Sequence, residues 1–168
     1  KELVEIGDFV TMNAYFEEMV GGRAAAKSFD NRAGIFCVSE TLRRVKKDIK
    51  AELYGVSAVQ EEIGLRGAKT AAFAVNPQVA VALDVTHAFD IPDVDKRKGA
   101  DICLGKGPVI VRGPNINRKV FRRLVEVAQA NEIPYQIAAS GGGTGADANV
   151  IQLSREGVAT GLIGLPLR

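Results

Sequence analysis

Helix-like and strand-like patterns alternate along the chain from about residue 30 onward. Apolar side chains recur at steps of three and four, as on one face of a helix, at Ile35, Val38, Leu42, Val45 and Ile49. This period predicts an amphipathic helix over 31–49. Further helices are predicted at 68–75, 117–131 and 147–156, and short apolar runs predict strands at 53–59, 79–85, 109–112, 134–139 and 158–163. The alternation predicts a three-layer α/β/α sandwich with a largely parallel sheet.

Composition limits the class of protein. The 168 residues suffice for about one domain, and the net charge of +2 is too small to indicate a nucleic-acid partner. No 18-residue apolar stretch and no signal peptide is present, so no membrane partner is expected. Cys37 and Cys103 lack a CxxC neighbour, and we expect two buried thiols in a reducing compartment, the cytoplasm. The basic run from Arg43 to Lys47 is either a solvated helix face or a partner site.

The first 23 residues have no helical period. Residues 8–13 alternate as a strand does, and Gly21 and Gly22 interrupt the chain. We expect residues 1–23 to belong to a separate all-β module. The chain starts at Lys1 and stops directly after a predicted strand, so we also expect both ends to lie inside a longer protein.

Acidic residues stand at the ends of two predicted strands. Glu61 and Glu62 follow the run at 53–59, and Asp84 lies near the end of the run at 79–85. Ligands of parallel sheets bind at the carboxyl ends of strands, and a buried carboxylate is costly without a counter-charge. A divalent metal ion would supply that charge, and the alternative is that the acids lie in solvated loops. In an adjacent pair, one carboxylate can bind metal while the other takes a proton from water.

An ordered set of motifs surrounds and follows these acids. It consists of residues 28–34 (SFDNRAG), 60–68 (QEEIGLRGA), 81–86 (VALDVT), 107–108 (GP), 133–136 (IPYQ), 144–148 (TGADA) and 157–160 (GVAT). The set covers nearly the whole chain and resembles the M42 family of co-catalytic metallo-aminopeptidases. That family includes glutamyl, deblocking and tetrahedral aminopeptidases, and some members were named endoglucanases.

The resemblance implies a role for each acid. Asp30 would bridge two divalent ions, zinc or cobalt. Glu61 would be the general base, Glu62 a ligand, and Asp84 a ligand of the other metal. The family also uses two histidine ligands, which the resemblance places before and after this chain. His87 is the only histidine here, and we expect it beside the ligands rather than on a metal.

Other residues near the motifs have more than one possible role. Arg32 could orient the carboxylates or simply open the helix. Asp30 and Asp147 both stand where they could cap helices, and for Asp147 we favour the cap over a ligand role. The glycine-rich run at 140–145 could line a substrate site, and it lacks the phosphate-loop pattern of nucleotide-binding proteins. A long polar loop is predicted at 86–107.

The resemblance also implies a substrate and an assembly. Residues 1–23 would be the end of an inserted β-barrel domain, and residues 24–168 the C-terminal part of a metallopeptidase catalytic domain. Peptides are the expected substrates, and a homo-oligomer, a dodecamer in the family, is the expected assembly. Without the two histidines, we expect this chain alone to be nearly inactive. The alternatives are an endoglucanase-type glycosidase, whose carboxylates would have to face each other about 5–9.5 Å apart, and a non-catalytic assembly fragment.

Overall fold

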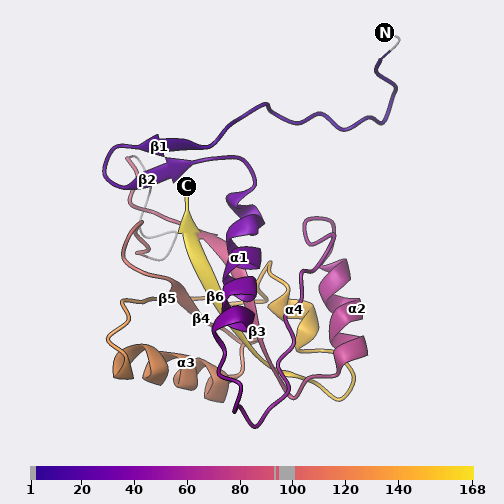
Figure 1. Cartoon of the computed structure of the whole chain (residues 1–168), viewed down its shortest axis with the longest axis vertical. Helices are drawn as coiled ribbons and strands as arrows, with labels where there is room; N and C mark the ends of the chain where they lie inside the picture. Colours follow the sequence, from indigo (N-terminus) through magenta and orange to yellow (C-terminus); the bar gives the residue numbers. More distant parts are fainter. Residues whose placement is uncertain (1–2, 93, 95–100) are drawn as a thin grey trace.

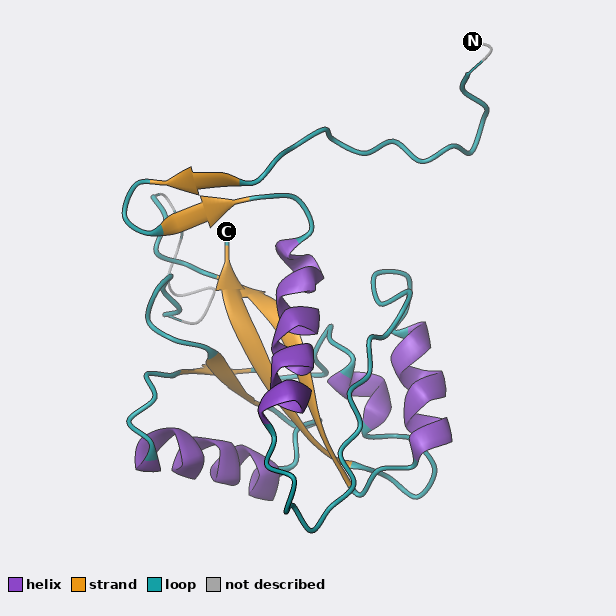
Figure 2. Cartoon of the chain, viewed as in Figure 1, coloured by secondary structure: helices purple, strands orange, loops and turns teal. Residues whose placement is uncertain are grey.

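The computed structural model describes residues 3–92, 94 and 101–168 (Figure 1). Its helices and strands, distinguished by colour in Figure 2, are β1 (Glu17–Met19), β2 (Arg23–Ala25), α1 (Phe29–Arg44), α2 (Arg66–Val75), β3 (Val79–His87), β4 (Val109–Arg112), α3 (Arg118–Ala130), β5 (Gln136–Ala139), α4 (Ala148–Ile151) and β6 (Ala159–Leu167). None of the helices in this described part of the chain is long and apolar enough to span a bilayer.

A four-stranded sheet with the order β3-β6-β4-β5 forms the centre of the molecule. β3 and β6 pair in parallel along their whole length, from Val79 opposite Ala159 to His87 opposite Leu167. β4 and β5 are also parallel, whereas β4 and β6 are antiparallel. Most pairings are therefore parallel, which confirms the predicted α/β class. The antiparallel pairing at the middle of the sheet was not predicted.

Helices cover both faces of β6. A Cβ atom on Gly161 would lie 2.7 Å from Val120 Cγ1, so the helix α3 packs directly on the backbone of β6 at this point. The next residue, Leu162, belongs to a buried cluster that also contains Ala148 of α4. Successive residues of a strand point to opposite faces, so α3 and α4 lie on opposite sides of the sheet. This arrangement gives the three predicted layers.

Core packing and hydrogen bonds hold residues 102–107, which precede β4, against β5. Val109 of β4 is fully buried, and Ile102 packs in the same cluster. The Gln136 side chain accepts a hydrogen bond from Cys103 N at 2.9 Å and donates to Cys103 O at 3.0 Å and Gly107 O at 2.9 Å. Cys37 and Cys103 are free thiols, but both are half-buried, so the expectation of buried thiols is met only in part.

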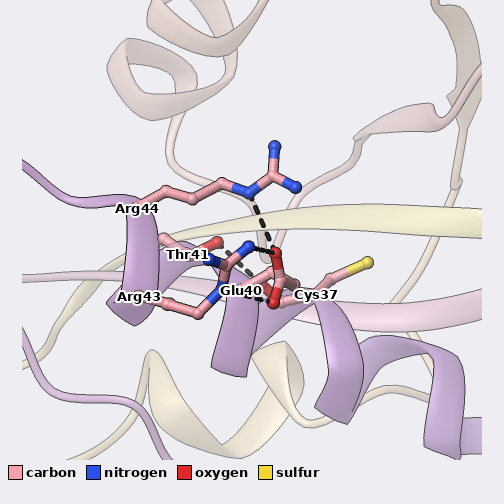
Figure 3. A network of polar contacts seen from close by, with 5 residues as sticks. All are labelled: Cys37, Glu40, Thr41, Arg43 and Arg44. Carbon is pink, nitrogen blue, oxygen red and sulfur yellow. Dashed lines mark hydrogen bonds and ion pairs between the residues drawn. The ribbon is translucent and has the colours of Figure 1, made fainter.

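The outer face of α1 carries an ion-pair network, shown in Figure 3. Glu40 accepts hydrogen bonds from Arg43 at 2.7 and 2.8 Å and from Arg44 at 2.9 Å. The Arg43 bond, followed by the Arg44 bond, lowers the pKa of Glu40. These arginines are exposed and paired within their own helix. Arg43 and Arg44 therefore lie on a solvated helix face, whereas Lys46 and Lys47 follow the end of the helix at Arg44, and a partner site on this run stays a prediction.

Residues 3–16 contain neither helix nor strand, so the predicted strand at 8–13 is wrong. Phe9 and Val10 are 99% and 91% exposed, which means that their side chains have no surface to pack on. Alternation of apolar residues cannot form a strand without such a surface and a pairing partner. The β1–β2 hairpin crosses the predicted boundary at residue 23, and membership of a separate β-domain stays a prediction.

The segment after α1 departs most from the predicted elements. The helix ends at Arg44 because Val45 takes extended backbone angles, φ −61° and ψ 138°. Residues 53–59 form no strand and are exposed apart from the half-buried Ala58, so the predicted buried strand is wrong. A buried strand needs pairing partners, and in the described residues β3 pairs with β6 alone. The run at 53–59 therefore stays extended but unpaired.

Several boundaries also differ. β3 continues to His87 and β6 to Leu167, so both strands are longer than predicted. The predicted helix at 147–156 is reduced to the short α4. The predicted loop at 86–107 includes positions 93 and 95–100, which lie outside the described residues.

Candidate metal and catalytic site

Glu61 and Glu62 lie in a tight turn that leads into α2. Glu61 O accepts a hydrogen bond from Leu65 N at 2.8 Å, and Val59 O accepts one from Gly67 N at 2.8 Å. Glycine is required at position 67, because a Cβ atom there would lie 2.4 Å from Val59 N. The turn leaves the Glu61 side chain half-buried and the Glu62 side chain exposed. The two neighbouring carboxylates therefore have different surroundings.

Asn31 connects the start of α1 to β3 beside Asp84. Its Nδ2 donates to Leu83 O at 2.8 Å and to Asp84 Oδ1 at 3.4 Å. Asp84 is half-buried, and burial raises the pKa of its carboxyl, although the hydrogen bond from Val85 N at 2.8 Å works against this. The charge of Asp30 raises the same pKa further. Asn31 was not among the predicted site residues, although it stands in the SFDNRAG motif.

Neither aspartate expected to cap a helix does so. Asp30 has non-helical backbone angles, and the first turn of α1 is capped by Asn31 instead, whose Oδ1 accepts a hydrogen bond from Gly34 N at 2.8 Å. Asp147 occupies the cap position of α4 but also makes no side-chain cap bond. Both predictions of a cap are therefore wrong. The two carboxylates instead line one groove together with Glu61 and Glu62.

Asp147 is the acidic residue that sequence reasoning missed as a site residue. Its carboxyl is half-buried, and burial, followed by the charge of Asp84, raises its pKa. The Oδ1 atom is buried without a hydrogen-bond partner among the described residues. Such an oxygen is costly unless something binds it. The TGADA motif was the available signal, because Asp147 is its acidic member.

The charges of these acids converge on Glu61. Burial raises its pKa to about 7, and the neighbouring charges raise it in the order Asp84, Glu62, Asp147 and Asp30. No cation contributes to this shift. The predicted acids from α1, the turn before α2, and β3 are therefore brought within electrostatic range of one another. A negative site of this kind favours a bound cation.

The remaining predicted residues stand apart. His87 ends β3 with an exposed side chain, and Arg32 is exposed on α1. No hydrogen bond between either side chain and the acids is found in the described residues. In the same residues, no three His, Cys, Asp or Glu side chains are close enough to one another to hold a metal ion. The charges of the acids act on one another, but among the described residues the acids do not form a complete set of metal ligands.

Four of the acids, Asp30, Glu61, Glu62 and Asp147, line a groove of about 750 Å³, and Leu83, the residue before Asp84, also lines it. Its walls are α1, the extended run at 53–58, α2 and the first half of β3. A smaller cavity of about 410 Å³ lies between β4 and the start of α3 and contains none of the predicted site residues. The larger groove is therefore the one that belongs to the candidate site.

Comparison with known proteins identifies relatives along the whole chain. Lysyl aminopeptidase of Pyrococcus furiosus is 43% identical over 164 residues, which are 97% of this chain and 45% of the relative. The aminopeptidase APDkam598 from the archaeon Desulfurococcus kamchatkensis superposes with a TM-score of 0.83 at 40% identity, covering 92% of this chain and 44% of that one. The structure of PhTET1-12s, a dodecamer, superposes with a TM-score of 0.72 at 30% identity over 98% of this chain and 49% of its own.

These matches extend over only part of each relative. The chain spans about half the length of the relatives that it matches. The model of the M42 glutamyl aminopeptidase family matches residues 1–168, which include every acid of the candidate site. The chain belongs to the M42 glutamyl aminopeptidase family.

Proposed function

We propose that this chain carries the general base and three of the metal ligands of an aminopeptidase that removes N-terminal residues from peptides. The observation that carries the proposal is the convergence of four acidic charges on Glu61 without a compensating cation. Membership of the M42 family and the relatives named aminopeptidase support the peptide as substrate.

The donor chemistry suits divalent ions such as zinc or cobalt. Carboxylate oxygens bind such ions, and the buried Oδ1 of Asp147, which has no hydrogen-bond partner among the described residues, supports a bound cation at this end of the groove. In the proposal, the carboxylates of Asp30, Glu62 and Asp84 would hold the ions. These residues do not close a site by themselves. We propose that two histidines outside this sequence complete it.

Glu61 handles the proton in this scheme. Bound divalent ions would supply Lewis-acid polarisation of the peptide carbonyl and a lower pKa for the attacking water. The half-buried Glu61 carboxylate accepts the proton of that water and passes it to the departing amine. Ions bound to the neighbouring acids would lower the raised pKa of Glu61, because they would neutralise the charges that raise it, and the ionised carboxylate could then accept a proton at neutral pH.

Variants of a longer protein that contains this chain test the assignment. Glu61→Gln should lower kcat by about 10²–10⁴-fold and leave bound metal unchanged, because it removes only the proton acceptor. Asp84→Ala should lower the bound metal and kcat together. Glu40→Gln, on the outer face of α1, is the matched control and should change neither. Full activity of Glu61→Gln would contradict the base assignment.

The 168-residue chain provides a second test. Calorimetric titration with Zn²⁺ or Co²⁺ should detect weak binding that Asp84→Ala abolishes, and hydrolysis of aminoacyl-p-nitroanilides should be close to background. Strong metal-dependent cleavage by this chain alone would contradict the need for further ligands. Absence of metal binding by the longer protein would favour a non-catalytic assembly role.

We also propose a homo-oligomeric assembly for the complete protein. The support is that the related PhTET1-12s is a dodecamer. Light scattering of the complete protein would test this, and a monomer at micromolar concentration would contradict it.

A further inference from the structure

The Asn31 side chain uses both ends of its amide inside the fold. Its Nδ2 donates to Leu83 O at 2.8 Å and to Asp84 Oδ1 at 3.4 Å. Its Oδ1 accepts a hydrogen bond from Gly34 N at 2.8 Å. The reverse orientation of the amide would place an oxygen against the Leu83 carbonyl and the Asp84 carboxylate, which can only accept hydrogen bonds. The neighbours of Asn31 therefore determine how its amide is oriented.

Glycine at position 34 allows Asn31 to lie over the first turn of α1. Gly34 is buried, and a Cβ atom there would collide with the amide group of Asn31. From this place the Asn31 side chain joins the start of α1 to β3, across 52 and 53 positions of the sequence. The start of α1 also carries Asp30. One amide thus connects the two elements that carry Asp30 and Asp84.

The two oxygens of the Asp84 carboxylate differ in their surroundings. Oδ1 accepts hydrogen bonds from Val85 N at 2.8 Å and from Asn31 Nδ2 at 3.4 Å. Oδ2 accepts none from the described part of the chain, and it is not among the buried oxygens that lack a partner. The lone pairs of Oδ2 therefore remain available, whereas those of Oδ1 already have donors.

We propose that Asn31 is a positioning residue of the candidate metal site. Together with Val85 N it holds Asp84 Oδ1, so that Oδ2 is the oxygen left to bind a cation, and it keeps Asp30 and Asp84 at a fixed spacing. This inference rests on the proposed function, in which both aspartates hold the ions. Hydrogen-bonding groups that orient metal ligands are typical of metal sites, and their loss lowers metal affinity by about 10–100-fold.

A double-mutant cycle in the 168-residue chain tests the contact between Asn31 and Asp84. Asn31→Asp keeps an acceptor for Gly34 N, so a role as helix cap alone predicts little change in stability. In the proposal it removes a donor and brings two carboxylates together. The unfolding equilibrium constant, measured with urea and a chelator at pH 7, should therefore rise about ten-fold. In an Asp84→Asn background the same change should raise it about three-fold or less, because the new amide at position 84 can donate to the new carboxylate. Equal costs in both backgrounds would overturn the proposal.

Metal binding by a longer protein that contains this chain tests the effect on the site. Asn31→Ser keeps a side chain that can cap the helix but is too short to reach β3. It should weaken Co²⁺ binding by about 10–100-fold and change the visible absorption of the Co²⁺-loaded protein, which reports the geometry of the ligands. Asn117→Ser, the same change at the cap of α3, should alter neither.

The outcomes separate this inference from the proposed function. A native longer protein that binds no Co²⁺ would contradict the proposed function and, with it, a role of Asn31 at a metal site. A native protein that binds Co²⁺, with the same affinity and spectrum in Asn31→Ser, would overturn this inference alone.

Discussion

At the scale of residues, Glu61 has the charge state that depends most on its neighbours. Its pKa is about 7 in the fold, against 4.5 for a free glutamate side chain. The folded chain therefore holds more protons between these pH values, so its stability falls as the pH rises through this window and stays lower above pH 7. Glu61 is partly exposed, and after allowance for solvent screening we expect a loss of about 1 kcal/mol.

Urea unfolding in the presence of a chelator measures this effect. The free energy of unfolding of the native chain, relative to Glu61→Gln, should be lower at pH 8 than at pH 5. Comparison with this variant isolates Glu61 from other groups that titrate in the window. An identical pH dependence in both proteins would show that the neighbouring acids do not act on Glu61.

The site was predictable from the sequence only in part. Glu61 and Asp84 could be named because acids stand at the ends of apolar runs and within family-like motifs. The contact from Asn31 to Leu83 spans 52 positions, and no local pattern reports it. Asp147 was assigned to a helix cap because a short-range rule fits its position, whereas its burial depends on segments far away in the sequence.

At the scale of elements, the start of α3 combines a good cap with unfavourable charges. Asn117 Oδ1 accepts hydrogen bonds from Lys119 N at 2.9 Å and Val120 N at 3.2 Å. No acidic residue stands in the first turn, where the helix dipole favours one. Asn117→Ala should lower the free energy of unfolding by about 1 kcal/mol. Asn117→Asp should keep the cap and raise it by about 0.3–1 kcal/mol. Urea denaturation of both variants checks this, and equal stability would contradict the role of the cap.

The predicted bounds were most accurate for the elements whose apolar side chains are buried. The cores of β3, β4 and α3 match the predicted runs within a few residues, because their side chains meet β6 or each other. The run at 53–59 has an equally apolar sequence but no strand beside it. The same holds for the predicted end of α1, where Ile49 is 43% exposed. A pattern of apolar residues in the sequence indicates which side chains could be buried. Packing against other elements determines whether they are buried.

At the scale of the whole molecule, the strands of the sheet differ in how many neighbouring strands they have. β6 has partners on both edges, whereas β3 and β5 lie at the two ends of the sheet. Strand composition predicted an α/β sheet but not the antiparallel pairing of β4 with β6, because pairing direction depends on the path of the connections. The central position of β6 makes its hydrogen bonds dependent on the integrity of both halves of the sheet.

Hydrogen exchange should therefore show a wide range of protection. Amides of Ile163 and Gly164 in β6 should exchange only when the chain unfolds globally, because strands flank them on both sides. Amides at 53–58 should exchange near the rate of an unstructured peptide, since no backbone hydrogen bond holds them. In Asn117→Ala, a loss of about 1 kcal/mol should speed exchange in β6 by about five-fold and leave residues 53–58 unchanged. Equal protection of the two segments would contradict this order. It would mean that the run at 53–58 is already paired in the isolated chain.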